Sequence, residues 1–128
     1  GARFVATNRD PVYPAADGLK AGAGAMVAAV ATAVGRQPDL VVGKPEPRLF
    51  EAAADMSGVP LREAVVIGDN LLTDIAAARA VGARSVLMLT GVTSQADLDA
   101  APPDTHPTLV AADAAELEAR LEELALGG

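Results

Sequence analysis

The chain has 128 residues, of which 51% are hydrophobic and only 2% are aromatic, so its core must consist mainly of aliphatic side chains. Acidic residues outnumber basic ones by 17 to 10, and a net charge of −7 without a cluster of cations excludes binding along nucleic acid. Cysteine is absent, which excludes disulfides and thiolate metal sites. No apolar run approaches the roughly 18 residues of a membrane span and no export signal is recognisable, so we expect a cytoplasmic protein without a membrane partner.

Apolar runs and amphipathic stretches alternate along the chain. The expected elements are, in order, a strand at 4–7, a helix at 22–34, a strand at 40–42, a helix between 48 and 57, a strand at 64–67, a helix at 73–81, a strand at 85–90, a loop at 91–105 with a weak helical turn near 95–98, a strand at 108–110 and a helix at 114–124. This alternation predicts an α/β fold, a three-layer Rossmann-like parallel sheet with helices on both faces. In such sheets the chemistry takes place beyond the carboxyl ends of the strands, here after Val42, Ile67 and Leu89.

Two carboxylates follow the predicted strand that ends at Ile67. Gly68 permits a tight turn, Asp69 stands at the strand end, and Asp74 falls in the first turn of the next helix, where the helix dipole favours a negative charge. Hard oxygen ligands in this arrangement suit Mg²⁺, which takes one or two carboxylates together with water and phosphate. By residue type alone, a turn residue and a helix cap explain the same pattern equally well.

Lys44 stands at the end of another predicted strand, between Gly43 and Pro45. A lysine in this position can neutralise phosphate oxygens or a neighbouring carboxylate as a point charge. In isolation, a solvated surface lysine is the simpler interpretation. A functional role for Lys44 is favoured only when it is considered together with the carboxylates that follow the next predicted strand.

The two motifs together resemble the haloacid dehalogenase (HAD) superfamily of phosphatases. The segment 43–50, GKPEPRLF, is similar to the third motif of that superfamily, and the segment 65–75, VVIGDNLLTDI, is similar to its fourth. The segments 4–8 and 87–93 resemble the branch typified by NagD, the nitrophenyl phosphatases and the phosphoglycolate or glycerol-phosphate phosphatases. The resemblance extends over nearly the whole chain.

This resemblance implies Mg²⁺-dependent hydrolysis of small phosphate monoesters. Lys44 would orient a nucleophilic aspartate and balance the charge of the transferring phosphoryl group, and Lys44 and Asn70 would bind phosphate. Asp69 would bind Mg²⁺, and Asp74 would act as an outer ligand or position the water molecules of the metal.

The family's reaction proceeds through an aspartyl-phosphate on the first Asp of an Asp-x-Asp-Gly motif, whose second Asp is the general acid and base. The only Asp-x-Asp here is Asp97-Leu98-Asp99, which follows no strand and is expected in a solvated loop. The resemblance therefore implies the C-terminal half of such a phosphatase, a fragment that lacks the nucleophile. The alternative is a naturally short, non-catalytic protein that keeps a phosphate- and Mg²⁺-binding or interaction module. A start without Met, inside a predicted strand, favours the fragment.

Members of this branch carry a cap domain between the second and third motifs. Thr7 ends a strand as the second motif does, but it lies too near Lys44 for a whole cap to fit between them. We therefore favour residues 1–43 as the C-terminal part of the cap over a genuine second motif at Thr7. Residues 44–128 would form the C-terminal half of the HAD-like core domain. The residues expected in a substrate-specificity loop of the cap are Asn8, Arg9 and Asp10.

The expected partners follow from this division. The substrate would be a small phosphorylated metabolite, and the missing N-terminal half of the same protein would pair with the strand at 64–67. Without that half the strand has an unpaired edge, and an unpaired edge invites self-association of the chain.

Overall fold

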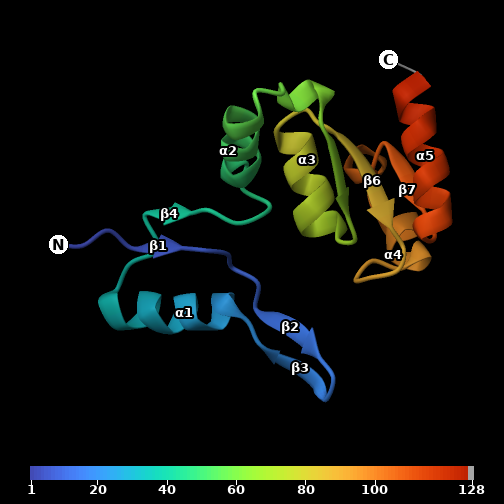
Figure 1. Ribbon diagram of the computed structural model, residues 1–128. Coiled ribbons are helices and arrows are strands. Elements are labelled where there is room, and N and C mark those ends of the chain that lie inside the picture. Colours follow the sequence, from blue (N-terminus) through green and yellow to red (C-terminus); the bar gives the residue numbers. More distant parts are fainter. Residues whose placement is uncertain (127–128) are drawn as a thin grey trace.

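The computed structural model describes residues 1–126 (Figure 1). Its elements are β1 (Val5–Ala6), β2 (Val12–Ala15), β3 (Gly18–Ala21), α1 (Ala23–Val34), β4 (Leu40–Val41), α2 (Arg48–Ser57), η1 (Leu61–Glu63), β5 (Val65–Gly68), η2 (Leu71–Ile75), α3 (Ala76–Ala80), β6 (Arg84–Met88), α4 (Gln95–Ala100), η3 (Pro103–Thr105), β7 (Leu109–Ala111) and α5 (Ala114–Leu126). Over these residues, no helix has both the length and the hydrophobicity that crossing a membrane requires.

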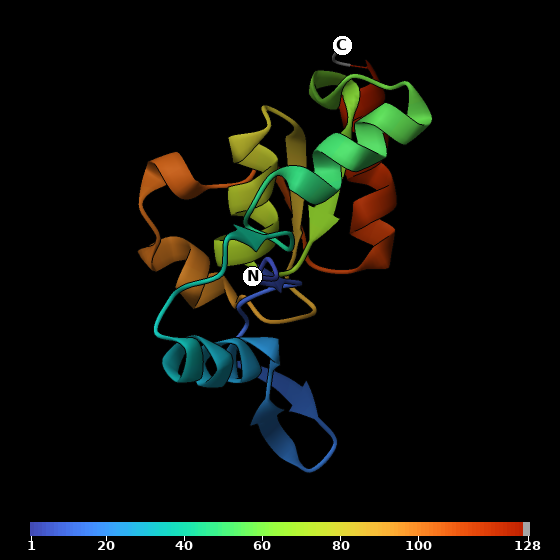
Figure 2. The same cartoon turned by 90° about the vertical axis from the view of Figure 1, so that its left-hand side faces the viewer.

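Strands β5, β6 and β7 form a parallel three-stranded sheet in that order. Its register pairs Val66 with Ser85, and Val86 with Leu109. Helix α3 lies on one face of the sheet and α5 on the other, with β6 between them in both views (Figures 1 and 2). The predicted α/β fold, a parallel sheet with helices on both faces, is confirmed.

The central position of β6 explains its continuous apolar sequence. Neighbouring residues of a strand point to opposite faces, and Val86 and Leu87 are both fully buried. Leu87 belongs to a core cluster with Leu71, Ile75 and Leu98, so the residues that follow β5 pack directly on the central strand. Complete burial stabilises the fold by about 1.5–3 kcal/mol for each side chain of this size.

The first 43 residues form a second set of elements, the N-terminal region. Strand β1 pairs in parallel with β4, Val5 with Leu40 and Ala6 with Val41, and β2 and β3 form an antiparallel hairpin. The hairpin and α1 lie away from the three-stranded sheet (Figure 1). Helix α1 ends at Gly35, whose φ of 68° is the left-handed conformation that the predicted C-terminal glycine provides.

The hairpin of β2 and β3 is absent from the sequence prediction. Its register leaves a two-residue turn, Ala16-Asp17, followed by Gly18 with a φ of 118°, a conformation open to glycine. The sequence signal for this turn is Asp-Gly, which is typical of short hairpin loops. Pro14 obscures the signal because proline within a run argues against a strand.

Helix α4 confirms the helical turn predicted near 95–98 in the loop after β6, and it extends two residues beyond it. Ser94 Oγ accepts a hydrogen bond from the Asp97 N–H at 3.2 Å, and Asp97 Oδ2 accepts one from the Ser94 N–H at 2.9 Å, which completes a capping box. The prediction that Asp97-Leu98-Asp99 lies in a loop is therefore wrong. Asp97 and Asp99 are exposed on a capped helix, and Leu98 between them packs into the core cluster.

Candidate active site

Asp69 follows β5 directly, at the end of the sheet where α/β folds place their chemistry. It is half-buried, and its Oδ2 accepts a hydrogen bond from the backbone N–H of Val92 at 2.9 Å. Within residues 1–126, Oδ1 of the same carboxylate accepts no hydrogen bond. One oxygen is thus held by the protein and the other is available to a ligand.

Asp74 lies in η2, a π-helical turn at the start of the helix that the sequence predicts. Asn70 begins this turn: its Oδ1 accepts a hydrogen bond from the Leu72 N–H at 2.9 Å, and its carbonyl oxygen accepts one from the Ile75 N–H at 3.2 Å. The turn carries Asp74 back over Gly68, where a Cβ would overlap the Asp74 carboxylate. Glycine at this strand end is therefore required by the close approach of the carboxylate.

The Asp74 carboxylate is buried, with 7% of its side chain exposed, and has donors on both oxygens. Its Oδ2 accepts hydrogen bonds from the backbone N–H groups of Asp69 and Asn70 at 3.1 Å each. Its Oδ1 accepts one from Nζ of Lys44 at 2.5 Å. A buried charge is tolerated when it has partners of this kind, and removing one partner leaves the charge uncompensated. Asp74 therefore serves to fix Lys44 and the end of β5.

Lys44 reaches this carboxylate from the loop that follows β4. The residue before it, Gly43, lies so close to the backbone oxygen of Thr7 and the Cβ of Asn8 that a Cβ at position 43 would overlap them. The side chain of Lys44 is 45% exposed. Its ammonium has three donors, so it can bind Asp74 and an anion in the adjoining pocket at the same time.

A pocket of about 550 Å³ joins these charged groups to the N-terminal region. The strand ends form its charged floor and the β2–β3 hairpin forms its wall. Its lining includes Asn8, Asp10, Val12, Tyr13, Leu19, Lys44, Asp69, Asn70, Thr73, Asp74 and Val92. Three carboxylates against one ammonium favour a cation, or a cation together with a phosphate, as the occupant. The volume is in the range of small-molecule sites.

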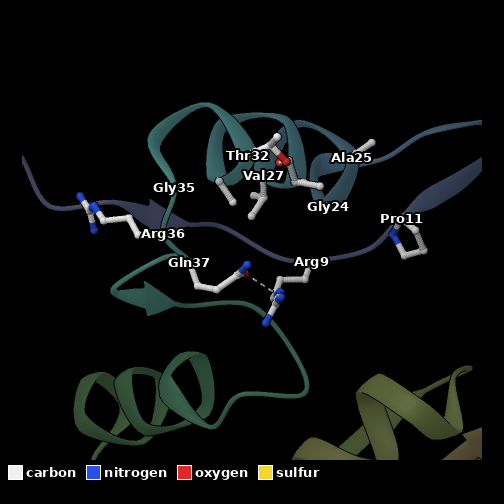
Figure 3. Close-up of a pocket in the computed structure, with 11 residues that line it drawn as sticks. Arg9, Pro11, Gly24, Ala25, Val27, Thr32, Gly35, Arg36 and Gln37 are labelled. Atoms are coloured by element: carbon white, nitrogen blue, oxygen red, sulfur yellow. Dashed lines mark hydrogen bonds between the residues drawn. The ribbon is translucent and has the colours of Figure 1, made fainter.

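The structure brings all but one of the predicted site residues to this pocket. The exception is Arg9, which lines a second cavity of about 680 Å³ beside α1 and donates a hydrogen bond to Oε1 of Gln37 at 3.3 Å (Figure 3). Asn8 and Asp10 flank Arg9 and line the first pocket. Alternate residues of an extended segment point to opposite sides, which explains why the loop divides in this way.

The sequence prediction of the site lacks three contributions to the pocket, from Thr73 of η2, from the hairpin and from Val92. Tyr13 and Leu19 lie on the hairpin, and they were missed together with it. Val92 contributes its backbone N–H, which no residue type reveals. The sequence signal for Val92 is its position just after the predicted strand that contains Leu89, because α/β folds place their chemistry beyond the carboxyl ends of such strands.

The donor set fits a small, hard cation that keeps part of its water. Asp69 offers one carboxylate oxygen to the pocket, whereas both oxygens of Asp74 are engaged by protein donors. Within residues 1–126, no three acidic, histidine or cysteine side chains gather into a complete metal cage. One carboxylate completed by water and phosphate oxygens is an arrangement that Mg²⁺ accepts.

Known proteins resemble this chain in sequence and in fold. The HAD-hydrolase-like family model matches residues 41–117. Ribonucleotide monophosphatase NagD of Escherichia coli is 38% identical over 122 residues, which cover 92% of this chain and 45% of NagD. The 4-nitrophenylphosphatase of Thermotoga maritima has a TM-score of 0.84 at 36% identity, over 91% of this chain and 44% of its own. The glycerol phosphate phosphatase of Mycobacterium tuberculosis, solved in complex with magnesium, has a TM-score of 0.81 at 44% identity, over 91% and 35% of the two chains.

These relatives are phosphatases, and the chain spans less than half of the length of each. The family model covers more than half of this chain and includes Lys44, Asp69 and Asp74. The chain therefore belongs to the HAD-hydrolase-like family, in the branch of NagD and of the nitrophenyl and glycerol-phosphate phosphatases.

Proposed function

We propose that this chain forms part of a Mg²⁺-dependent phosphatase that hydrolyses small phosphate monoesters. The observation that carries the proposal is the meeting of Lys44, Asp69 and Asp74 at one pocket from two separate strand ends. A cation beside a lysine ammonium neutralises a phosphoryl group, and charge neutralisation with positioning is most of what phosphoryl transfer requires. The phosphatase activity named for the relatives supports the same class of reaction.

In this proposal Asp69 binds Mg²⁺ through Oδ1, and water and phosphate oxygens complete the coordination. The bound ion supplies positive charge next to the phosphoryl group. The magnesium complex of the Mycobacterium tuberculosis phosphatase supports this choice of ion. Asp74 positions Lys44 for contact with the phosphate. Asn70 donates its amide N–H groups to the phosphate while its Oδ1 holds the start of η2.

The nucleophile in this proposal is an aspartate outside the present sequence. Its carboxylate attacks phosphorus, the ester oxygen leaves with a proton from a second aspartate, and water then hydrolyses the aspartyl-phosphate. Residues 1–128 contain no Asp-x-Asp-Gly, so another segment of the same protein would supply both groups. The edge of β5 is the proposed docking place for that segment. Among the described residues β5 pairs only with β6, and it lines a cavity of about 380 Å³ with α2.

We also propose that residues 1–43 belong to a cap domain and residues 44–128 to the core domain. Two observations support this division. Strand β1 pairs with β4 within residues 1–43, and the chain crosses from these elements to those of the three-stranded sheet once, near Lys44. Asn8 and Asp10 would contact the substrate from the cap side, and Arg9 would brace their loop through Gln37. The enzyme would act on a phosphorylated metabolite in the cytoplasm, and the open edge of β5 would allow the isolated chain to associate with itself.

The test uses the full-length gene product with Mg²⁺ and 4-nitrophenyl phosphate. Asp69→Asn preserves the shape of the side chain and removes its charge, so we expect kcat/KM to fall at least about 100-fold, with a similar loss in Lys44→Ala. Asp99→Asn, on the exposed surface of α4, is the matched control and should keep wild-type activity. If Asp69→Asn is as active as this control, Asp69 is not the Mg²⁺ ligand, and a wild-type protein that hydrolyses no phosphate ester would overturn the phosphatase proposal. A wild-type protein that binds Mg²⁺ and phosphate without hydrolysing esters would instead be the non-catalytic binding module.

A further inference from the structure

The turn that follows β6 holds Asp69 in two places. The N–H of Val92 donates a hydrogen bond to Oδ2 of Asp69, and the N–H of Thr93 donates one to the backbone oxygen of Asp69, each at 2.9 Å. The side chain and the main chain of Asp69 are therefore fixed by two successive N–H groups of one turn.

Thr93 anchors this turn to the other side of Asp69. The residue is buried, and its Oγ1 accepts a hydrogen bond from the N–H of Leu71 at 3.1 Å. Leu71 is the first residue of η2, where a backbone N–H has no acceptor within the helical turn itself. Without the Thr93 hydroxyl the buried N–H of Leu71 would have no acceptor, which costs free energy. The hydroxyl therefore ties the turn to the segment that carries Asp69.

Gly91 allows the turn to come this close. A Cβ at this position would overlap Oδ2 and the carboxyl carbon of Asp69. The φ of Gly91 lies outside the left-handed region, so the backbone of the turn would accept other residues. What the glycine provides is room for the carboxylate. A methyl group at position 91 would displace the Asp69 side chain and disturb its bond to Val92.

We propose that Gly91, Val92 and Thr93 are positioning residues that orient the Asp69 carboxylate toward the cation. The inference rests on the proposed function and assigns a separate task to each oxygen of Asp69: Oδ2 is bound to the turn and Oδ1 is directed to the metal. Partners that orient a ligand in this way raise metal affinity because the carboxylate is already in its binding orientation.

The first test is Gly91→Ala in the full-length gene product, with Asp99→Asn as the control. We expect the Mg²⁺ concentration for half-maximal activity to rise about 10- to 100-fold, together with the Mg²⁺ dissociation constant measured by calorimetry without substrate. The KM for 4-nitrophenyl phosphate at saturating Mg²⁺ should stay near the wild-type value. Unchanged Mg²⁺ constants in a folded variant would overturn the proposal, even if the midpoint of thermal unfolding fell.

Two substitutions at Thr93 keep the test decisive if Gly91→Ala does not fold. Thr93→Val preserves the shape and removes the acceptor for the Leu71 N–H, whereas Thr93→Ser keeps that acceptor. We expect the Mg²⁺ dissociation constant to rise about 10-fold in Thr93→Val and to lie within about twofold of wild type in Thr93→Ser. Equal constants in the two variants would overturn the proposal.

Asp69→Asn separates this inference from the proposed function. If Asp69→Asn leaves Mg²⁺ binding unchanged, Asp69 is not a ligand, and the metal site of the proposed function fails together with the inference. If Asp69→Asn abolishes Mg²⁺ binding while the variants of Gly91 and Thr93 bind normally, only the positioning role fails.

Discussion

The N-terminal region (residues 1–43) and the sheet region (residues 44–126) contain similar aliphatic side chains and differ in what covers them. The sheet region buries Val86 and Leu87 completely. Among the described residues of the N-terminal region, only Ala6 and Ala31 are buried hydrophobic side chains, and Leu19 is 73% exposed. An apolar sequence therefore yields a core only where a second layer covers it, as α3 and α5 cover the sheet.

Residues of both regions line the pocket described above. Its charged floor, with Asp69 and Asp74, rests on the packed sheet, whereas its hairpin wall rests mainly on paired backbone. Segments with few buried apolar contacts open at a lower free energy than a packed core. We therefore expect a rigid floor and a more mobile wall.

Among substitutions that test the contrast between the two regions, we expect the largest change in the free energy of unfolding at Leu87. Leu87→Ala should lower the free energy of unfolding by about 2–5 kcal/mol, because it empties the centre of the core cluster. Val30→Ala, at a position of α1 that is 45% exposed, should change it by no more than about 0.5 kcal/mol. Urea unfolding followed by circular dichroism measures both. A large loss in Val30→Ala would mean that α1 is covered in solution and would remove the contrast between the regions.

A smaller effect is expected at the capping box of α4. Ser94→Ala should lower the free energy of unfolding by about 1 kcal/mol, because the Asp97 N–H loses its acceptor. Gln95→Ala, an exposed position on the same helix, is the control and should change it by less than about 0.5 kcal/mol. Thermal unfolding of the two variants decides the point, and equal midpoints would contradict the role of the cap.

The smallest expected effect is a pH-dependent contribution to stability from Asp39 in the N-terminal region. The guanidinium of Arg36 and the N–H of Phe4 donate hydrogen bonds to Asp39 and hold the pKa of its carboxyl below the ordinary value of 3.8. Because the folded pKa is the lower one, this stabilisation is present above the unfolded pKa and is lost as the pH falls through the folded pKa.

Asp39→Asn keeps the acceptor and removes the charge. We expect the wild type to unfold at a higher temperature than this variant at about pH 7, and the difference to disappear on acidification to about pH 2. Thermal melts across this range measure the difference. A difference that does not depend on pH would assign the effect of the substitution to something other than the charge of Asp39.

Burial explains which elements could be predicted from the sequence. The apolar run of β6 predicts a strand because coverage of both faces requires such a run, and the position of Asp69 follows from the end of β5 in the parallel sheet. Lys44 follows β4, which pairs with β1 in a separate two-stranded sheet, so the three-stranded sheet alone does not place it at the pocket. The β2–β3 hairpin is largely exposed, so it carries no apolar alternation, and only the turn at Asp17-Gly18 marks it. The turn after β6 acts through backbone N–H groups, and those are invisible in a pattern of residue types.

The π-helical turn η2 also limits how this stretch of chain can change in length. Such a turn holds one residue more than an α-helical turn, and each residue advances a helix by about 100°. Leu72, in the middle of the stretch between the two carboxylates, is 81% exposed, so many side chains can replace it. Deleting one residue there would instead convert the turn into an ordinary α-helix and rotate Asp74 away from Lys44. Insertions and deletions between Asp69 and Asp74 should therefore be far less acceptable to this protein than exchanges of the residue at position 72.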